Sequence, residues 1–227
     1  MTTQEFFTEL DARIAKYDLL CHPFYKAWSA GELTRKDLQN YGQNYFHHVN
    51  AFPEYLQALA SRLPEGEMRR AVEANHDDET GLHGSRPHSE LWLDFVEGMG
   101  SERVGSTKAI TEIDALMRRF HSAAIEGGAE EALATFYAYE SQVPRVANEK
   151  ARGLQVMYGA DAKSCEYFTL HKTADVYHSR VWKQQLANAV ESNSQAAERA
   201  LNAAENAAKA LWNALDGIEA QRMARAA

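Results

Sequence analysis

Residues 167–178 carry the sequence YFTLHKTADVYH, in which His171, Asp175 and His178 follow one another at steps of four and three residues. In a helix that turns by about 100° and rises by about 1.5 Å per residue, these side chains form one stripe about 10 Å long. Imidazole and carboxylate groups cost free energy to bury unpaired, so an ordinary amphipathic helix would place apolar residues there. The spacing therefore predicts a row of metal ligands. The alternative interpretation is a polar, solvent-facing side with two ordinary histidines.

Length and charge narrow the class of protein. The chain has 227 residues, of which 45% are apolar and 25% charged, enough for one sizeable core and too few to require two domains. Its net charge of -8 and its pI near 5.6 offer no basic surface for nucleic acid or an anionic membrane. We therefore expect one globular domain that binds neither nucleic acid nor a membrane.

The N-terminus and the cysteines indicate the compartment. Met1 to Leu10 lack the basic-then-apolar pattern of a signal peptide, and no apolar run approaches the roughly 18 residues that span a bilayer. The two cysteines, Cys21 and Cys165, form no C-x-x-C motif, so neither a disulfide framework nor a thiolate zinc site is predicted. We expect a cytoplasmic protein.

Apolar residues recur at three- and four-residue steps along nearly the whole chain, which predicts an all-α fold. Thr34 and Asp37 form a capping-box pattern, Pro23 fits the first turn of a helix, and no alternating run predicts a strand. We expect a helical bundle in residues 1–190 and an alanine-rich helix within 191–227, in the same domain or peripheral to it. That last helix offers the core little beyond Leu201, Leu211, Trp212, Leu215 and Ile218. The helices are expected at residues 2–16, 22–31, 34–61, 65–81, 88–98, 107–126, 129–157, 162–189 and 195–224.

Acidic and imidazole side chains on other predicted helices extend the metal-site prediction. Glu140 follows the aromatic run Phe136-Tyr137-Ala138-Tyr139, where an inward-facing carboxylate needs a cation or a proton. Glu79 closes one predicted helix and His88 opens the next, so a folded-back loop can bring them together. Helical bundles hold pairs of transition-metal ions with such groups, and three carboxylates with three imidazoles suit iron or manganese. The predicted ligands of a dinuclear site are Glu79, His88, Glu140, His171, Asp175 and His178.

Four motifs follow one another along the chain: Asp78-Glu79-x-Gly81, His88-x-x-Leu91-Trp92, Tyr139-Glu140-x-x-x-Pro144 and His171-x3-Asp175-x2-His178. In this order they resemble the haem-oxygenase-like dimetal oxidases. Among these, the chain is most similar to the chlamydial proteins associating with death domains (CADD) and their bacterial relatives, over roughly Phe6 to Leu186. The resemblance implies a TenA/PqqC-like seven-helix bundle with an extra C-terminal helix, two irons or an iron with manganese, dioxygen, and an external reductant as electron donor.

The resemblance also implies a reaction. Members of the CADD-like subgroup are held to make 4-aminobenzoate for folate biosynthesis from a tyrosine of their own chain, with nitrogen from a lysine. By motif, Tyr25 matches the sacrificed tyrosine and Lys150 matches the lysine. Lys150 follows Glu140 by ten residues, about 15 Å along an ideal helix, so its approach to the metals requires a bend at Pro144.

Other residues and other functions remain open at this stage. Tyr41, Tyr45, Tyr139 and Tyr167 are rival tyrosines that could line the cavity as hydrogen-bond donors or radical relays. The loop between Glu79 and His88 varies in length among such proteins, so Asp78 or His83 could replace either of these two ligands. Alternative functions are a dimetal oxidase of a diffusible small molecule, a metal-free thiamin-degrading enzyme with a cysteine nucleophile, and a non-enzymatic helical interaction protein. A homodimer is also expected.

Overall fold

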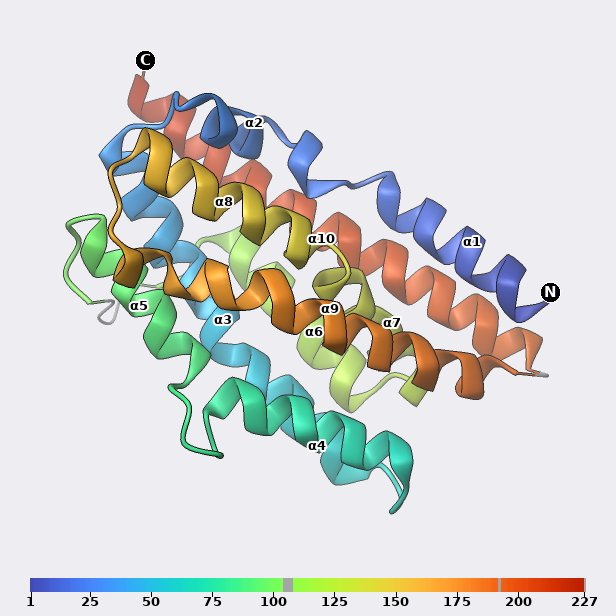
Figure 1. Cartoon of the computed structure of the whole chain (residues 1–227). Helices are drawn as coiled ribbons and strands as arrows, with labels where there is room; N and C mark the ends of the chain where they lie inside the picture. The colour runs from blue at the N-terminus through green and yellow to red at the C-terminus, as the bar shows by residue number, and fades with distance from the viewer. Residues whose placement is uncertain (104–107, 192, 227) are drawn as a thin grey trace.

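The computed structural model describes residues 1–103, 108–191 and 193–226, and every regular element within these ranges is helical (Figure 1). The predicted all-α fold is confirmed. None of the helices in these ranges has both the length and the apolar character needed to cross a membrane. The elements are α1 (Thr3–Ala15), the 3-10 helix η1 (Leu19–Cys21), α2 (Pro23–Ala30), α3 (Arg35–Arg62), α4 (Glu67–Thr80), α5 (His88–Gly98), α6 (Thr111–Ile125), α7 (Ala129–Glu140), α8 (Val143–Met157), α9 (Ala162–Val190) and α10 (Ser194–Ala226).

Several helix ends follow the predicted local signals. The Thr34 hydroxyl accepts from the backbone N of Asp37 at 3.2 Å, and the Asp37 carboxylate accepts from the backbone N of Thr34 at 2.9 Å. The capping box that opens α3 is therefore confirmed. Gly81 ends α4 with φ at 70°, a left-handed conformation that glycine adopts without steric cost. This turn sends the chain back toward α4, and α5 begins at His88.

The single helix predicted for residues 129–157 is wrong, because the chain forms two helices there. α7 stops at Glu140 and α8 begins at Val143. Pro144 fits the first turn of α8, because N–H groups in a first turn have no partner within the helix. Inside a continuous helix its ring would clash with the carbonyl of Glu140. A break between two helices therefore replaces the predicted bend, and Lys150 lies on α8 whereas Glu140 lies on α7. The predicted start of the sixth helix, Thr107, lies outside the described residues, and α6 begins at Thr111.

The alanine-rich helix α10 packs against α7, α6 and α1, and Figure 1 shows α1 running beside it. The structure corrects the expectation that few of its residues reach the core. Small side chains let the backbones approach closely, and α10 shares one hydrophobic cluster with the other helices. The break after α7 is one reason why the described residues form ten α-helices, whereas the resemblance implied seven and an extra C-terminal helix, which corresponds to α10. The fully buried alanines of α10 are Ala200, Ala204, Ala207, Ala208 and Ala214.

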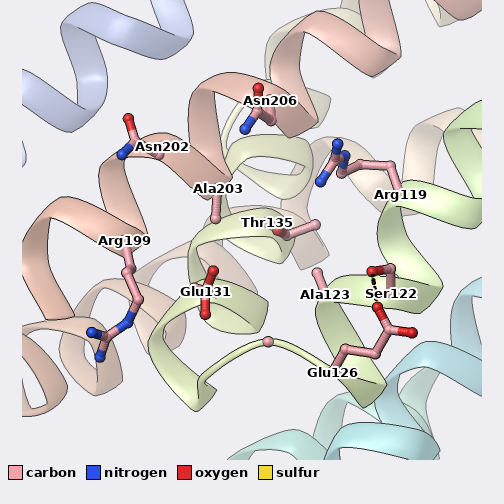
Figure 2. A pocket seen from close by; sticks show the side chains of 11 residues that line it. Arg119, Ser122, Ala123, Glu126, Glu131, Thr135, Arg199, Asn202, Ala203 and Asn206 are labelled. Atoms are coloured by element: carbon pink, nitrogen blue, oxygen red, sulfur yellow. Dashed lines mark hydrogen bonds between the residues drawn. The ribbon is translucent and has the colours of Figure 1, made fainter.

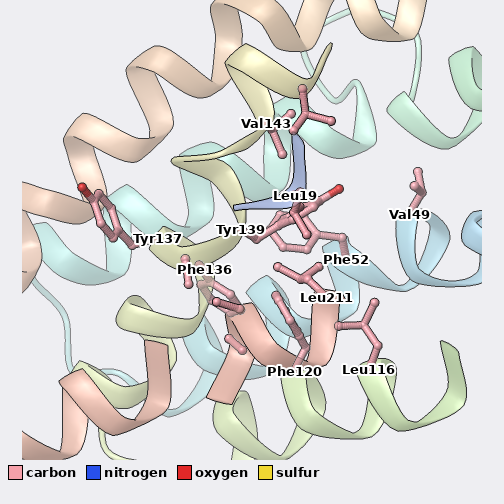
Figure 3. Packing of buried hydrophobic residues seen from close by; sticks show 14 of the residues in the cluster. Leu19, Val49, Phe52, Leu116, Phe120, Phe136, Tyr137, Tyr139, Val143 and Leu211 are labelled. Atoms are coloured by element: carbon pink, nitrogen blue, oxygen red, sulfur yellow. The ribbon is translucent and has the colours of Figure 1, made fainter. Parts of the chain in front are cut away.

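Aromatic side chains fill the core between α3, α6 and α7. Figure 3 shows Phe52, Phe120 and Tyr139 converging, and the ring centroids of Phe52 and Phe120 lie 5.4 and 6.1 Å from that of Tyr139. His48 lies in the same core, with its ring centroid 4.8 Å from Phe120 and 5.1 Å from Tyr139. Neither of its nitrogens has a hydrogen-bond partner among the described residues. Burial lowers the pKa of His48 to about 3, so the folded protein holds a neutral imidazole here.

We predict that His48→Leu makes stability less sensitive to acid. The unfolded wild-type chain binds a proton at His48 below pH of about 6.5, whereas the folded chain does so only near pH 3. Stability is therefore lost as the pH falls, by up to about 1.4 kcal/mol per pH unit, and between pH 7.5 and pH 5 the variant should lose about 2 kcal/mol less. Chemical denaturation of both metal-free proteins measures this difference, with the exposed His121→Leu as control. Identical pH profiles for wild type and His48→Leu would contradict it.

Candidate metal centre

Helix α9 carries the predicted row of ligands and turns it inward. His171, Asp175 and His178 are 3%, 1% and 4% exposed, so this side of the helix faces the interior rather than solvent. Helices α4, α5 and α7 pack against α9, and Figure 1 shows α9 running lengthwise along the bundle. The row therefore faces helices that carry the other candidate ligands.

Glu79, His88 and His171 form a first group, in which one potential ligand atom from each lies within 4.8 Å of the others. Nδ1 of His88 lies 2.9 Å from Oε2 of Glu79, and Nε2 of His171 lies 3.8 Å from Oε1. The turn at Gly81 brings the start of α5 back beside the end of α4. One carboxylate thus faces two imidazoles from different helices.

Glu140, Asp175 and His178 form a second group with the same 4.8 Å limit. Nδ1 of His178 lies 3.2 Å from Oδ1 of Asp175 and 3.9 Å from Oε1 of Glu140. Glu140 is the last residue of α7, which packs against α9. Two carboxylates share one imidazole here, so this group is richer in oxygen than the first.

The buried acids and imidazoles shift one another's proton affinities. Burial raises the pKa of Glu79, but His88 and His171 lower it more strongly, to well below its ordinary range. Burial lowers the pKa of His171 and His178, but nearby carboxylates, Asp175 foremost, raise the two values to about 9 and about 10. Burial raises the pKa of Glu140 to about 8. A buried cluster of this kind needs positive charge, which protons supply in the metal-free protein and metal ions supply by displacing them.

Two residues that the sequence analysis missed hold Glu140. Nδ2 of Asn75 donates to Oε1 of Glu140 at 2.9 Å, and Nε1 of Trp182 donates to Oε2. Asn75 precedes Glu79 by four residues and Trp182 follows His178 by four, so each extends a row of ligands by one helical turn. That spacing is the signal that could have identified them.

The two alternative ligands lie outside both groups. The side chain of His83 is 76% exposed, and its Nε2 lies 3.5 Å from Oδ2 of Asp77. The side chain of Asp78 is 54% exposed, and its Oδ2 lies 3.1 Å from Nε2 of His178, the ring nitrogen opposite the one that faces Asp175. Asp78 therefore touches a candidate ligand from the outside.

Tyr25, Tyr41 and Lys150 form a second buried polar cluster. The phenol oxygens of Tyr25 and Tyr41 lie 3.0 Å apart, and Nζ of Lys150 donates to the Tyr41 oxygen. The same Nζ lies 4.3 Å from the centroid of the Tyr25 ring. Burial raises the pKa of both phenols well above the ordinary value and lowers that of the Lys150 amine, so neutral forms are favoured.

Tyr139 and Tyr167 lie between this cluster and the candidate ligands. Both line a small cavity with Glu79, Glu140, His171 and Asp175, and both line a second cavity with Tyr25 and Lys150. Tyr167 also stacks on His171, with ring centroids 4.0 Å apart. The two phenols therefore form a shared wall between the ligand groups and the Tyr25 cluster.

Other candidate features lie away from these cavities. Cys21 is exposed and Cys165 buried, neither lines the two cavities, and burial raises the pKa of the Cys165 thiol, which disfavours a thiolate nucleophile. A polar pocket between α6, α7 and α10 is lined by Arg119, Thr135 and Asn206 among others (Figure 2). Its lining includes none of the predicted site residues.

The donor set fits a pair of metal ions. Oδ2 of Asp175 is buried without a hydrogen-bond partner in the described part of the chain, so it keeps a lone pair for a metal. The two neighbouring groups draw three carboxylates and three imidazoles from four helices, a set that suits iron or manganese in a helical bundle.

The arrangement of helices matches that of a solved structure. A TenA homologue from Pseudomonas syringae pv. tomato superposes with a TM-score of 0.80, covering 95% of this chain and 91% of its own, at 14% identity. Such low identity supports likeness of fold alone. The fold is therefore that of the TenA-like helical proteins, and the six buried donors within it fit a dinuclear metal site.

Comparison of sequences gives the family. A family model described as an iron-containing redox enzyme matches residues 39–212. The 4-aminobenzoate synthase of Nitrosomonas europaea is 36% identical over 230 residues, which cover 96% of this chain and 92% of the relative. The 4-aminobenzoate synthase of Chlamydia muridarum is 35% identical over 219 residues, covering 95% and 91%. The chain belongs to the iron-containing redox enzyme family, and the similarity to the chlamydial subgroup is confirmed.

Proposed function

We propose that the protein makes 4-aminobenzoate for folate biosynthesis in an oxygen-dependent reaction, with Tyr25 as the source of the ring and Lys150 as the amino donor. The names of relatives that match nearly the whole chain support the product. The observation that carries the self-sacrificing part is the position of Nζ of Lys150, 4.3 Å from the centroid of the Tyr25 ring. Tyr25 and Lys150 line one cavity, and two other residues of its lining, Tyr139 and Tyr167, also line the cavity beside the candidate metal ligands.

The six buried donors would hold two irons, or an iron with manganese. When bound, and with an external reductant, these ions supply the reduction of dioxygen and the removal of electrons from a phenol. Asn75 and Trp182 occupy one hydrogen-bonding position on each oxygen of Glu140, and thereby orient its remaining lone pairs.

Lys150 contributes a neutral amine at the ring that it would modify. Only the unprotonated amine has a lone pair to give, and burial lowers the pKa of Lys150 toward that form. Tyr41 accepts a hydrogen bond from Lys150 and contacts the Tyr25 oxygen, so it positions both reacting groups. Tyr139 and Tyr167 line both cavities, and we assign them as the phenols that would pass electrons from Tyr25 to the metal centre.

The mass of the chain tests this proposal. After aerobic incubation with Fe²⁺, Mn²⁺ and a reductant, we expect a mass loss that maps to Tyr25. Protein made with ring-¹³C tyrosine and ¹⁵N lysine should release 4-aminobenzoate that carries both labels. Tyr25→Phe should abolish the product, because the ring then has no hydroxyl from which to remove electrons.

Tyr137→Phe is the matched control, since the Tyr137 hydroxyl donates to Asp11 at 2.8 Å and does not line either cavity. It should leave the yield of product unchanged. An unchanged chain mass together with oxidation of an added small molecule would instead favour an oxidase of a diffusible substrate.

A further inference from the structure

His171 and His178 each turn one ring nitrogen toward the carboxylates and the other away. Nε2 of His171 faces Glu79, and its Nδ1 lies 2.8 Å from the carbonyl oxygen of Tyr167. A carbonyl oxygen only accepts hydrogen bonds, so the neutral, metal-binding form of the ring carries its proton on Nδ1 and has its lone pair on Nε2. The backbone of α9 thus sets the ring of His171 for a metal in the first group.

His178 shows the same arrangement with its nitrogens exchanged. Nδ1 faces Asp175 at 3.2 Å and Glu140 at 3.9 Å, inside the second group. Nε2 points outward and lies 3.1 Å from Oδ2 of Asp78. The outward nitrogen of His178 therefore meets a side-chain carboxylate where that of His171 meets a backbone carbonyl.

We infer that Asp78 is a positioning residue for the metal centre: its carboxylate accepts a hydrogen bond from the Nε2–H of His178 and so directs the Nδ1 lone pair toward a metal ion shared with Asp175 and Glu140. This inference rests on the ligand set of the proposed function. A neutral imidazole has one nitrogen that donates and one that accepts, and only the second can bind a metal. Removing a carboxylate that orients a metal-binding histidine typically lowers metal affinity by about 10- to 100-fold.

The position of Asp78 separates this role from a general effect on folding. Neighbouring residues of a helix point about 100° apart, so the last turn of α4 sends Glu79 into the site and Asp78 to its rim. Because the Asp78 side chain is 54% exposed, replacing it leaves no buried cavity. Asp77 on the same helix is a natural control, since its carboxylate contacts His76 at 3.3 Å and His83, in the loop after the helix, at 3.5 Å, and neither of these belongs to the ligand groups.

Binding of Mn²⁺ to the metal-free full chain tests the inference without reference to activity. Equilibrium dialysis with elemental analysis should give two ions per wild-type chain. Asp78→Ala should bind one ion as wild type does and the second about 10- to 100-fold more weakly. Asp78→Asn keeps an acceptor oxygen and should recover most of the lost affinity. Asp77→Ala should match wild type, and the metal-free Asp78 variants should still unfold in one cooperative thermal transition, which shows that they are folded.

Three results would overturn the inference: wild-type affinity for both ions in Asp78→Ala, equal weakening of both ions, or the same loss in Asp77→Ala. A different combination of results would reject the proposed function and leave the role of Asp78 intact. A wild-type chain that binds two Mn²⁺ ions with the expected dependence on Asp78, yet keeps Tyr25 intact and releases no 4-aminobenzoate, would support the role of Asp78 and reject the proposed reaction.

Discussion

Glu79→Ala is expected to remove at least one metal ion per chain and to lower formation of 4-aminobenzoate by more than about 100-fold. Glu79 is the carboxylate that faces both His88 and His171, at 2.9 and 3.8 Å. Without it the first group keeps two neutral donors and no charge to balance a divalent ion in a buried place. Elemental analysis of the reconstituted protein and the product per chain after one aerobic incubation measure the two effects.

Glu73→Ala is the matched control for this prediction. Glu73 lies on the same helix, its side chain is 45% exposed, and it pairs with Arg69 at 2.8 Å. The Glu73→Ala variant should bind as many metal ions per chain as wild type and form as much 4-aminobenzoate. If Glu79→Ala kept two ions per chain and normal yield, Glu79 would not belong to the ligand set.

Lys150→Met is expected to abolish the product while making the fold more stable. The Lys150 amine is buried among aromatic rings, and its hydrogen-bond partner is a phenol rather than a carboxylate. Folding must remove its proton or bury its charge, and a methionine of similar shape avoids that cost, so we expect a gain of about 2 kcal/mol or more at pH 7.5. For a chain of this size, that gain raises the melting temperature by about 4 to 8 °C.

The pH dependence of this gain provides a second check. Burial lowers the pKa of Lys150 in the folded protein, whereas the unfolded chain holds the proton up to pH of about 10.4. The penalty therefore shrinks steadily as the pH rises toward that value and is absent above it, so the advantage of the variant should be smaller at pH 9 than at pH 7.5 and smaller again at pH 10. Thermal melts at pH 7.5, 9 and 10 measure this trend, with the exposed Lys209→Met as control. A Lys150→Met variant that still released ¹⁵N-labelled product would exclude Lys150 as the amino donor.

The sequence predicted much of the candidate site because ligand spacing within a helix is a local property. His171, Asp175 and His178 share a face whatever the rest of the chain does, and an aromatic context marked Glu140 as buried. Asn75 and Trp182 were missed because an amide and an indole are not typical metal ligands, although they lie one turn from residues that are.

Periodicity and capping signals alone were enough to predict an all-α fold, the start of α3 at Arg35, and the shared face of the row on α9, since each depends on residues within a few turns of one another. Contacts across the bundle depended on how separate helices pack. Lys150 reaches Tyr25 and Tyr41 because the chain breaks between α7 and α8, and the ring of His178 is set by Asp78 from another helix. Distances between helices follow from the packing of the whole core, which no local spacing encodes.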